Sequence, residues 1–272
     1  MRWGLEGVTV RFGSQVALED VTLSVTPGSV NVVVGGDGAG KSTLLRALVG
    51  LVRLAKGRSL RPAKKDIGYV PATAGLYVDL TVEENLAFVG RAYGVTGVKL
   101  TTRTEELLDR IGLMGARTRL GGQLSGGMQR KLAVAMALLH RPPMMVLDEP
   151  TTGIDPVSRS ELWRLISGAA ADGTGVVVAT TYVNEANRGS TVMLLEQGRA
   201  ITTGSPADII AGVPGTLGTV RSTAKPQGHS WRWGTSWRVW TPSDALPEGA
   251  QQIQPSFDDA VMIAELVNER GA

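Results

Sequence analysis

The chain has 272 residues, 43% of them hydrophobic, and a formal net charge of +3, a length that suits one sizeable domain plus an appendage. The lack of cysteine excludes disulfides and thiolate chemistry, and the small net charge does not by itself indicate nucleic-acid binding. No apolar run approaches the roughly 20 residues of a membrane-spanning helix, and the first residues lack a signal-peptide core, so we expect a soluble globular protein.

The first part of the chain predicts strands around a glycine-rich loop. Short β-like runs fill residues 5–35, with a turn at Pro27-Gly28. The apolar run at 30–34 predicts a buried strand, and residues 42–51 predict a helix. The string GGDGAGKST at 35–43 joins them and fits the phosphate-loop pattern G-x-x-x-x-G-K-[ST]. A glycine-rich turn that binds nothing is the alternative, which the strand–loop–helix context disfavours.

This loop has the chemistry to bind a nucleotide. Glycines let the backbone approach phosphates, while amides and the helix N-terminus supply positive potential. Lys41 adds a point charge, and Ser42 offers its hydroxyl to Mg²⁺. The predicted ligands of the nucleotide are Gly35, Gly36, Asp37, Gly38, Ala39, Gly40, Lys41, Ser42 and Thr43.

The middle of the chain is predicted to be helical. Residues 67–70 read as a short strand, which Pro71 stops. Capping boxes at Thr81–Glu84 and Thr102–Glu105 predict amphipathic helices over 81–93 and 102–111. A third helix is expected over 126–139.

Strands and helices then alternate again, which predicts an α/β core with parallel strands. The segments concerned are 144–147, 157–170, 176–179, 192–195 and 206–211. From about 215 the chain looks irregular and tryptophan-rich. It ends in an expected helix over 256–268, capped by Ser256 with Asp259 three residues on.

An acidic pair follows the strand at 144–147. Asp148 ends this strand, where a carboxylate can hold Mg²⁺ beside a phosphate loop. Glu149 follows on the other side of the extended chain, where it can polarise an attacking water. Taken alone, the pair is better explained as a helix N-cap with a solvated neighbour.

The pair is not alone, because LSGGMQR at 124–130 lies between it and the phosphate loop. Over residues 5–212 the chain resembles the ATP-binding-cassette ATPases, whose signature this string matches in sequence, spacing and order. The resemblance implies that Ser125, Gly126, Gly127 and Gln129 contact a nucleotide held by a second cassette. Small residues that open a helix suit that role, because they present amides and the helix dipole to an anion.

The resemblance implies further site residues and a fold. Residues 153–156 look like the D-loop that runs between two cassettes, and Phe12 stands where the family stacks an aromatic on adenine, although an ordinary core aromatic stays open as the alternative. The implied fold is an α/β P-loop NTPase core with a parallel sheet, an antiparallel β subdomain and a helical insertion at about 72–140. This domain would span 1–212, followed by a small α+β appendage at 213–272.

Two positions depart from the family pattern. Ala72 stands where the family carries a glutamine that touches Mg²⁺, and Thr181 where it carries a switch histidine. The two histidines, His140 and His229, lie elsewhere. We therefore expect that ATP is bound well by this chain's own loop and hydrolysed slowly, with Glu149 and Lys41 as the catalytic residues. The intact signature would complete a competent site on a non-identical second cassette.

The segment 76–86 resembles cassettes that serve exporters with a separate membrane subunit, of the multidrug, polysaccharide and lipid groups. The expected partner is an integral membrane permease, which would hold the chain at the cytoplasmic face of the membrane. Leu76, Tyr77 and Leu80 are candidates for that contact, or core residues of the insertion. A soluble cassette of translation or DNA repair, and a regulatory subunit that never hydrolyses its ATP, are the alternatives.

The C-terminal tail alternates tryptophan with arginine. Trp231, Trp233, Trp237 and Trp240 interleave with Arg232 and Arg238. Such alternation can stack nucleic-acid bases. We expect instead a β-hairpin whose indoles pack one small layer with the arginines facing water, and no nucleic-acid partner.

Overall fold

The computed structural model describes residues 3–73, 75–243 and 245–271. The chain divides into two units, Met1–Ala200 and Ile201–Ala272, and the division falls within strand β9. The sequence-based boundary after residue 212 stays a prediction. No helix in the described part of the chain is long and apolar enough to cross a membrane.

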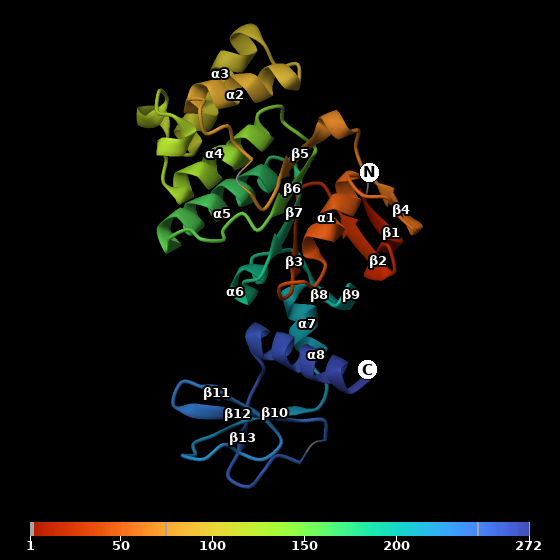
Figure 1. The fold of residues 1–272 in the computed structure, drawn as a ribbon. Helices are drawn as coiled ribbons and strands as arrows, with labels where there is room; N and C mark the ends of the chain where they lie inside the picture. The colour runs from red at the N-terminus through yellow and green to blue at the C-terminus, as the bar shows by residue number, and fades with distance from the viewer. Residues whose placement is uncertain (1–2, 74, 244, 272) are drawn as a thin grey trace. The chain divides into compact units, whose positions relative to one another are not determined.

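A six-stranded sheet in the order β5-β6-β7-β3-β8-β9 forms the centre of the first unit (Figure 1). Its strands are β3 (Val30–Val34), β5 (Ile67–Val70), β6 (Met144–Asp148), β7 (Gly175–Thr180), β8 (Thr191–Glu196) and β9 (Arg199–Gly204). The pairs β3–β7, β3–β8, β5–β6 and β6–β7 are all parallel. The predicted parallel core is therefore confirmed. Its strands β3, β6 and β7 are buried along their whole length, as expected of strands covered on both faces.

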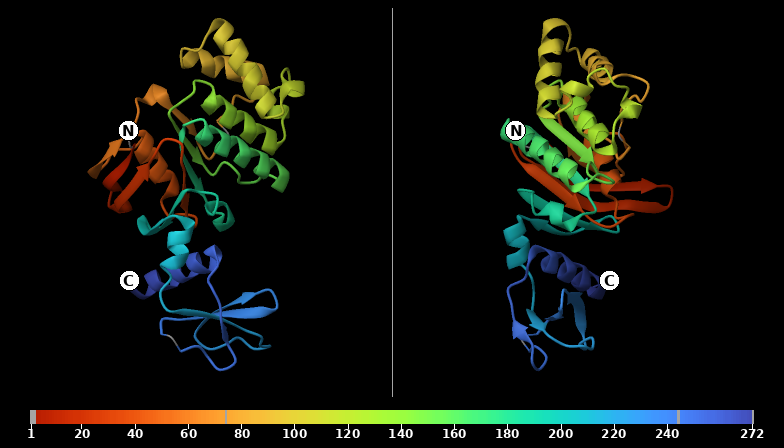
Figure 2. Two further views of the ribbon diagram at one scale, coloured as in Figure 1. Left: turned by 180° about the vertical axis from the view of Figure 1, so that it is seen from behind. Right: turned by 90° about the vertical axis from the view of Figure 1, so that its left-hand side faces the viewer.

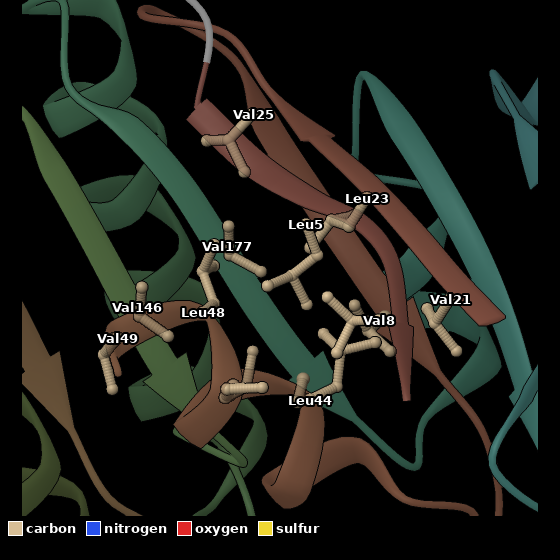
Figure 3. Close-up of a cluster of buried hydrophobic side chains, with 14 of the residues drawn as sticks. Leu5, Val8, Val21, Leu23, Val25, Leu44, Leu48, Val49, Val146 and Val177 are labelled. Atoms are coloured by element: carbon tan, nitrogen blue, oxygen red, sulfur yellow. The ribbon is translucent and has the colours of Figure 1, made fainter. Parts of the chain in front are cut away.

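A three-stranded antiparallel sheet, β2-β1-β4, packs against this core through helix α1. The bounds are β1 (Trp3–Phe12), β2 (Gln15–Val25), α1 (Lys41–Val49) and β4 (Lys56–Leu60). Leucines of α1 such as Leu44 and Leu48 lie between Leu5 and Val8 of β1 and the core strands (Figure 3). Burial of these apolar side chains holds the phosphate loop, which precedes α1, between the two sheets.

Helix α1 ends two residues before the predicted bound. Gly50 adopts φ 72° and donates its backbone N–H to the carbonyls of Ala47 and Arg46. A left-handed glycine directly after the last helical turn closes the helix, and the propensity of Leu51 does not extend it.

The remaining helices of the first unit are α2 (Val82–Ala92), α3 (Gly97–Arg110), α4 (Gly126–Leu138), α5 (Pro156–Ala171) and α6 (Val183–Ala186). Figures 1 and 2 show α4 and α5 side by side, with the parallel strands between them and α1. Short 3₁₀ turns lie at Lys64–Asp66, Met114–Ala116 and Gly121–Gln123. The helices α2, α3 and α4 make up the expected insertion.

The two predicted capping boxes had different outcomes. Thr81 caps α2 as expected, because its hydroxyl accepts from the Glu84 amide and the Glu84 carboxylate accepts from the Thr81 amide. The box at Thr102 is wrong, since α3 begins at Gly97 and Thr102 lies inside it. Thr102 and Glu105 are exposed. A Thr-x-x-Glu pattern on an exposed helical face has the same spacing as a cap, and no proline breaks the preceding turn.

The second unit is more regular than its sequence suggested. Its strands form a sheet in the order β11-β12-β10-β13. The bounds are α7 (Pro206–Ala211), β10 (Thr216–Val220), β11 (His229–Trp233), β12 (Ser236–Thr241), β13 (Gln251–Gln252) and α8 (Phe257–Gly271). Leu217, Trp240 and Ile263 form its core, with Trp231 packed against them. Ser256 and Asp259 cap α8 through reciprocal hydrogen bonds, as predicted.

The tryptophan hairpin is confirmed, but one of its arginines is not where we expected it. Strands β11 and β12 pair antiparallel, with Trp231 opposite Arg238 and Arg232 opposite Trp237. Opposite residues share a face of the sheet, so Arg238 lies on the face of Trp231 and not in water. Its side chain is 17% exposed and lies 3.5 Å from the buried Asp259 carboxylate. Trp231 and Trp237 therefore lie on opposite faces of the hairpin.

Candidate functional site

A cavity of about 570 Å³ opens beside the phosphate loop. The loop from Asp37 to Thr43 forms one side, and the turn between β1 and β2 forms the other. Glu149 and the turn residue Gln197 also line it. The loop predicted from sequence and the acidic residue after β6, more than 100 residues later, therefore reach the same cavity.

The loop backbone has the shape of an anion site. Gly40 is the N-cap of α1, with φ 105°, and within the described chain no side chain caps this helix start. A Cβ at Gly40 would lie 2.9 Å from the Ala17 carbonyl oxygen, so the position requires glycine. The first amides of α1 therefore point out of the loop without a side-chain acceptor, and such amides attract an anion.

Lys41 is held at the centre of the site. The side chain is 5% exposed, and Nζ donates to the carbonyl oxygens of Gly35 at 2.9 Å and Gly36 at 3.0 Å. The same nitrogen lies 3.3 Å from Glu149 Oε1. A buried ammonium is costly unless it is paired, and these three oxygens provide the pairing. They fix the position of the Lys41 ammonium group beside the loop.

Ser42 and Asp148 lie together and fit a magnesium ion. The Ser42 hydroxyl donates to Asp148 Oδ1 at 3.1 Å, whereas Oδ2 of Asp148 is buried with no hydrogen-bond partner among the described residues. Burial raises the pKa of Asp148, and a cation would favour its charged form. The described residues hold no group of three or more histidine, cysteine, aspartate or glutamate side chains that could bind a metal ion. Magnesium at nucleotide sites uses one or two protein ligands, phosphates and water, which this donor set matches.

Glu149 occupies a strained turn. Its φ is 47°, a left-handed conformation that is uncommon for residues other than glycine. The backbone N–H donates to the Ala179 carbonyl at 2.9 Å, and the Thr152 hydroxyl donates to Glu149 Oε2 at 3.0 Å. Strain of this kind costs about 1–3 kcal/mol and persists where surrounding contacts over-determine the backbone. The turn thus directs the carboxylate toward Lys41.

The signature residues lie away from this cavity, and none of them lines it. Ser125 caps α4 by accepting from the Met128 amide at 3.3 Å, and Ser125 and Gly126 are exposed. A Cβ at Gly127 would meet the Ser158 hydroxyl at 2.4 Å, so this glycine permits close packing of α4 on α5. Gln129 uses its amide group within the chain, donating to the Gly121 and Leu124 carbonyls.

The two positions that were expected to depart from the family pattern are Ala72 and Thr181. Ala72 is exposed, and its carbonyl accepts a hydrogen bond from Arg130 of α4 at 2.6 Å. Strand β7 ends at Thr180, and Thr181 follows it directly. The described histidines are elsewhere: His140 stacks on Tyr93 in the helical insertion, and His229 lies in β11 of the second unit.

Phe12 lies at the mouth of the cavity. It is 52% exposed, so its alternative interpretation as a core aromatic is wrong. Sequence reasoning missed three contributors to the site: Gln197 in its wall, Thr152 beside Glu149, and Arg130 beside Ala72. No short motif marks Gln197. Arg130 ends the LSGGMQR string, from which no role was predicted for it, and the pattern of Thr152 three residues after a carboxylate was available.

Comparisons with known sequences agree with this geometry. The family described as "ABC transporter" matches residues 18–152. The probable multidrug ABC transporter ATP-binding protein YbhF of Escherichia coli is 37% identical over 214 residues, covering 74% of this chain and 37% of that protein. The daunorubicin resistance ATP-binding protein DrrA2 of Streptomyces coeruleorubidus is 37% identical, over 74% of this chain and 66% of that protein. The Nod factor export ATP-binding protein I of a Rhizobium species is 35% identical, over 76% and 71%.

The matched region thus spans between about a third and three quarters of these relatives, depending on the protein. Solved structures show the same fold. An ATP-binding subunit of an ABC transporter superposes with a TM-score of 0.71 and 28% identity, over 78% of this chain and 92% of that one. A dimeric ATP-binding cassette with bound ADP and Pi gives a TM-score of 0.66 and 27% identity, over 75% and 98%. The chain belongs to the ATP-binding-cassette (ABC) transporter family and has the P-loop cassette fold of its ATP-binding subunits.

Proposed function

We propose that this chain binds and hydrolyses ATP and that it powers a membrane exporter as one half of an asymmetric pair of cassettes. The observation that carries the proposal is that a buried lysine, a serine and a glutamate line one cavity, and that the serine is hydrogen-bonded to the buried Asp148. Membership of a family whose sampled relatives are multidrug, daunorubicin-resistance and Nod factor export ATP-binding proteins supports the export assignment.

Binding would rest on the loop. The amides that open α1 and the charge of Lys41 would hold the β- and γ-phosphates of ATP. Ser42 and the unpartnered Oδ2 of Asp148 would hold Mg²⁺. When bound, this ion neutralises charge on the transferred phosphoryl group. Phe12, exposed at the cavity mouth, would contact the adenine ring.

Glu149 would position the attacking water and accept its proton. Its carboxylate lies 3.3 Å from Lys41 Nζ, so it stands on the side of the cavity where the γ-phosphate would lie. Phosphoryl transfer needs mainly positioning and charge stabilisation, which a fixed turn supplies. Lys41 would exchange its contact with Glu149 for one with phosphate, which frees the carboxylate to face water.

The proposed partner is a second, non-identical cassette. Ser125 and Gly126 are exposed and lie outside this chain's own cavity, which suits contact with a nucleotide on another subunit. This chain's own site lacks the glutamine and the histidine, whose loss typically lowers a rate by about 10²- to 10⁴-fold. We therefore propose slow turnover on this chain's loop and faster turnover on the partner's loop, sealed by this signature.

The proposed membrane partner is a permease subunit, which would place the chain at the cytoplasmic face of the membrane. Tyr77, Val78 and Phe88 of the helical insertion are exposed and apolar, whereas the predicted contacts Leu76 and Leu80 are half-buried. The buried Asn85 shapes the segment that bears Tyr77, through hydrogen bonds to the Tyr77 and Leu80 carbonyls. For the domain organisation we propose a cassette over 1–212 and an appendage over 213–272.

Calorimetry with Mg²⁺–ATP, followed by steady-state ATPase assays, tests the core of the proposal. We expect binding by the isolated chain and turnover that rises when candidate partner cassettes are added. A chain without affinity for Mg²⁺–ATP refutes the nucleotide function. Self-association into a fully active homodimer refutes the asymmetric pair.

A regulatory subunit that binds ATP as structural glue is the second candidate, favoured by Ala72 and Thr181. Glu149→Gln in this chain, compared with the matching change in the partner, separates the two. If this chain turns over ATP, Glu149→Gln lowers the total activity of the pair. If it only regulates, the activity falls with the partner's variant alone.

A further inference from the structure

A buried carboxylate lies behind the turn that carries Glu149. Glu185 of α6 is 2% exposed, and its Oε2 accepts hydrogen bonds from the hydroxyls of Thr151 at 2.9 Å and Thr180 at 2.8 Å. Its other oxygen, Oε1, lies 3.6 Å from Nε of Arg159. Thr151 and Thr180 are themselves almost fully buried. An acidic residue at such a position is rare unless these partners pay its desolvation cost.

The partners of Glu185 come from three structural segments, two of them more than 20 residues earlier in the chain. Thr151 lies in the turn after Glu149, Thr180 ends β7, and Arg159 lies in α5 just after the expected D-loop. Thr180 also accepts from the Tyr182 amide at 3.1 Å, and the Arg159 guanidinium lies over the Tyr182 ring at 4.5 Å. The network therefore includes both neighbours of Thr181, the position where the family pattern has its switch histidine.

We propose that Glu185 is a positioning residue that fixes the Glu149 turn, the end of β7 and the start of α5 relative to one another. We call Glu185 with Thr151, Thr180 and Arg159 the acid clamp. The clamp adds to the backbone bond that the Glu149 amide donates to the Ala179 carbonyl of β7. Its proposed effect on turnover rests on the ATPase function proposed above.

The acid clamp would help to hold Glu149 in its strained backbone conformation. A non-glycine residue at φ 47° tends to relax toward negative φ unless its neighbours hold it. The Thr151 hydroxyl, two residues later, is tied to a buried charge, and bonds to charged groups are stronger than neutral ones. Loosening this tie would let the carboxylate of Glu149 move within the cavity. A misplacement of about 1 Å can lower a rate by about 10²-fold.

The experiment compares matched threonine variants in the full chain. Thr151→Val keeps the shape and removes the hydroxyl, whereas Thr151→Ser keeps the hydroxyl. Amide hydrogen exchange of the nucleotide-free protein reports on residues 149–155 and 180–186. We expect Thr151→Val to speed exchange in the turn by about 3- to 10-fold, the loss of one hydrogen bond, and Thr151→Ser to leave it near wild type.

Turnover and binding are then measured on the same proteins. We expect kcat of Thr151→Val to fall about tenfold while its Kd for Mg²⁺–ATP stays within about twofold, because the phosphate loop is untouched. Thr180→Val and Thr180→Ser form a second matched pair with the same expectation. Glu185→Ala removes the carboxylate itself and should also lower kcat. If this variant does not fold, the two threonine pairs still test the proposal.

Two results would overturn the proposal. Wild-type exchange rates in both valine variants would show that the clamp holds nothing, and a parallel loss of binding and turnover would show a general structural role. If the wild-type chain neither binds nor hydrolyses ATP, the proposed ATPase function fails, and the exchange rates still test the clamp by themselves.

Discussion

The proposed ATP site has two sides that differ in their side chains. The phosphate side is the loop with Lys41, Ser42 and Asp148, and the sensing side is Ala72 and Thr181, which are not among the residues that line the cavity. On the phosphate side, the buried Lys41 donates to two carbonyls of the loop, and Ser42 donates to Asp148. On the sensing side, Ala72 presents a methyl group, and its backbone carbonyl is taken by Arg130. Thr181 follows β7 without an imidazole. The two sides rely on different chemistry, because phosphate is held mostly by backbone amides and sensing depends on single side chains.

The difference between the two sides leads us to expect that ATP binding and ATP turnover depend on different groups of this site. A backbone cradle survives most substitutions, so binding can persist while individual sensing groups are lost. The acid clamp, in contrast, joins Thr151, two residues after Glu149, and Thr180, next to Thr181, to the carboxylate of Glu185. We therefore expect this site to bind ATP readily and to hydrolyse it slowly.

The largest effect should come from Glu149→Gln. If Glu149 is the remaining proton acceptor on the sensing side, its loss lowers the turnover of this chain's own site by about 10²- to 10⁴-fold. Binding of Mg²⁺–ATP should stay, since the loop is unchanged. Single-turnover hydrolysis of ³²P-labelled ATP measures the rate. The exposed Glu248→Gln serves as the control, and equal rates in wild type and Glu149→Gln would contradict the assignment.

Lys41→Ala should weaken the phosphate side itself. The charge-assisted contact to phosphate is lost, and we expect Kd for Mg²⁺–ATP to rise about 10- to 100-fold. Isothermal titration calorimetry measures it. Lys64→Ala changes an exposed lysine outside the cavity and should leave Kd unchanged. A Kd that responds equally to both changes would mean that Lys41 acts only through overall charge.

Restoring the sensing side should raise turnover more modestly. Ala72→Gln combined with Thr181→His supplies the two missing side chains, and we expect about a tenfold gain at this chain's site. The gain is smaller than the full effect of such groups because neither has evolved partners to position it here. Each single variant should give less than the pair. Unchanged turnover in the double variant would place the limit elsewhere in the site.

Substitutions in the second unit should have the smallest effect on ATP binding at the cavity. Trp240 is 2% exposed, and its indole N–H donates to the Pro214 carbonyl at 2.7 Å. Trp240→Ala should lower the free energy of unfolding of this unit by about 3–5 kcal/mol. Trp233, at 43% exposed, is the matched control and should cost roughly 1 kcal/mol or less. Denaturant titration by tryptophan fluorescence measures both, and ATP affinity should not change in either variant.

Much of the fold was predictable because its signals are local. The apolar run at 30–34, the glycine loop and the acidic end of 144–148 each depend on neighbours in sequence, and each lies in the expected element. The Thr81 capping box and the tryptophan hairpin are equally local. The sequence alone also determined that no histidine follows β7, since residues 180–187 read TTYVNEAN.

Other features depended on contacts across long sequence separations. Local pattern placed Thr102 at a helix start and Arg238 in water, and packing placed the first inside α3 and the second against buried Asp259. The acid clamp joins residues up to 34 positions apart and leaves no motif. Spacing along a chain fixes which face of an element a side chain takes. Which distant groups meet there is decided by tertiary packing, because desolvation and pairing energies depend on all the neighbours together.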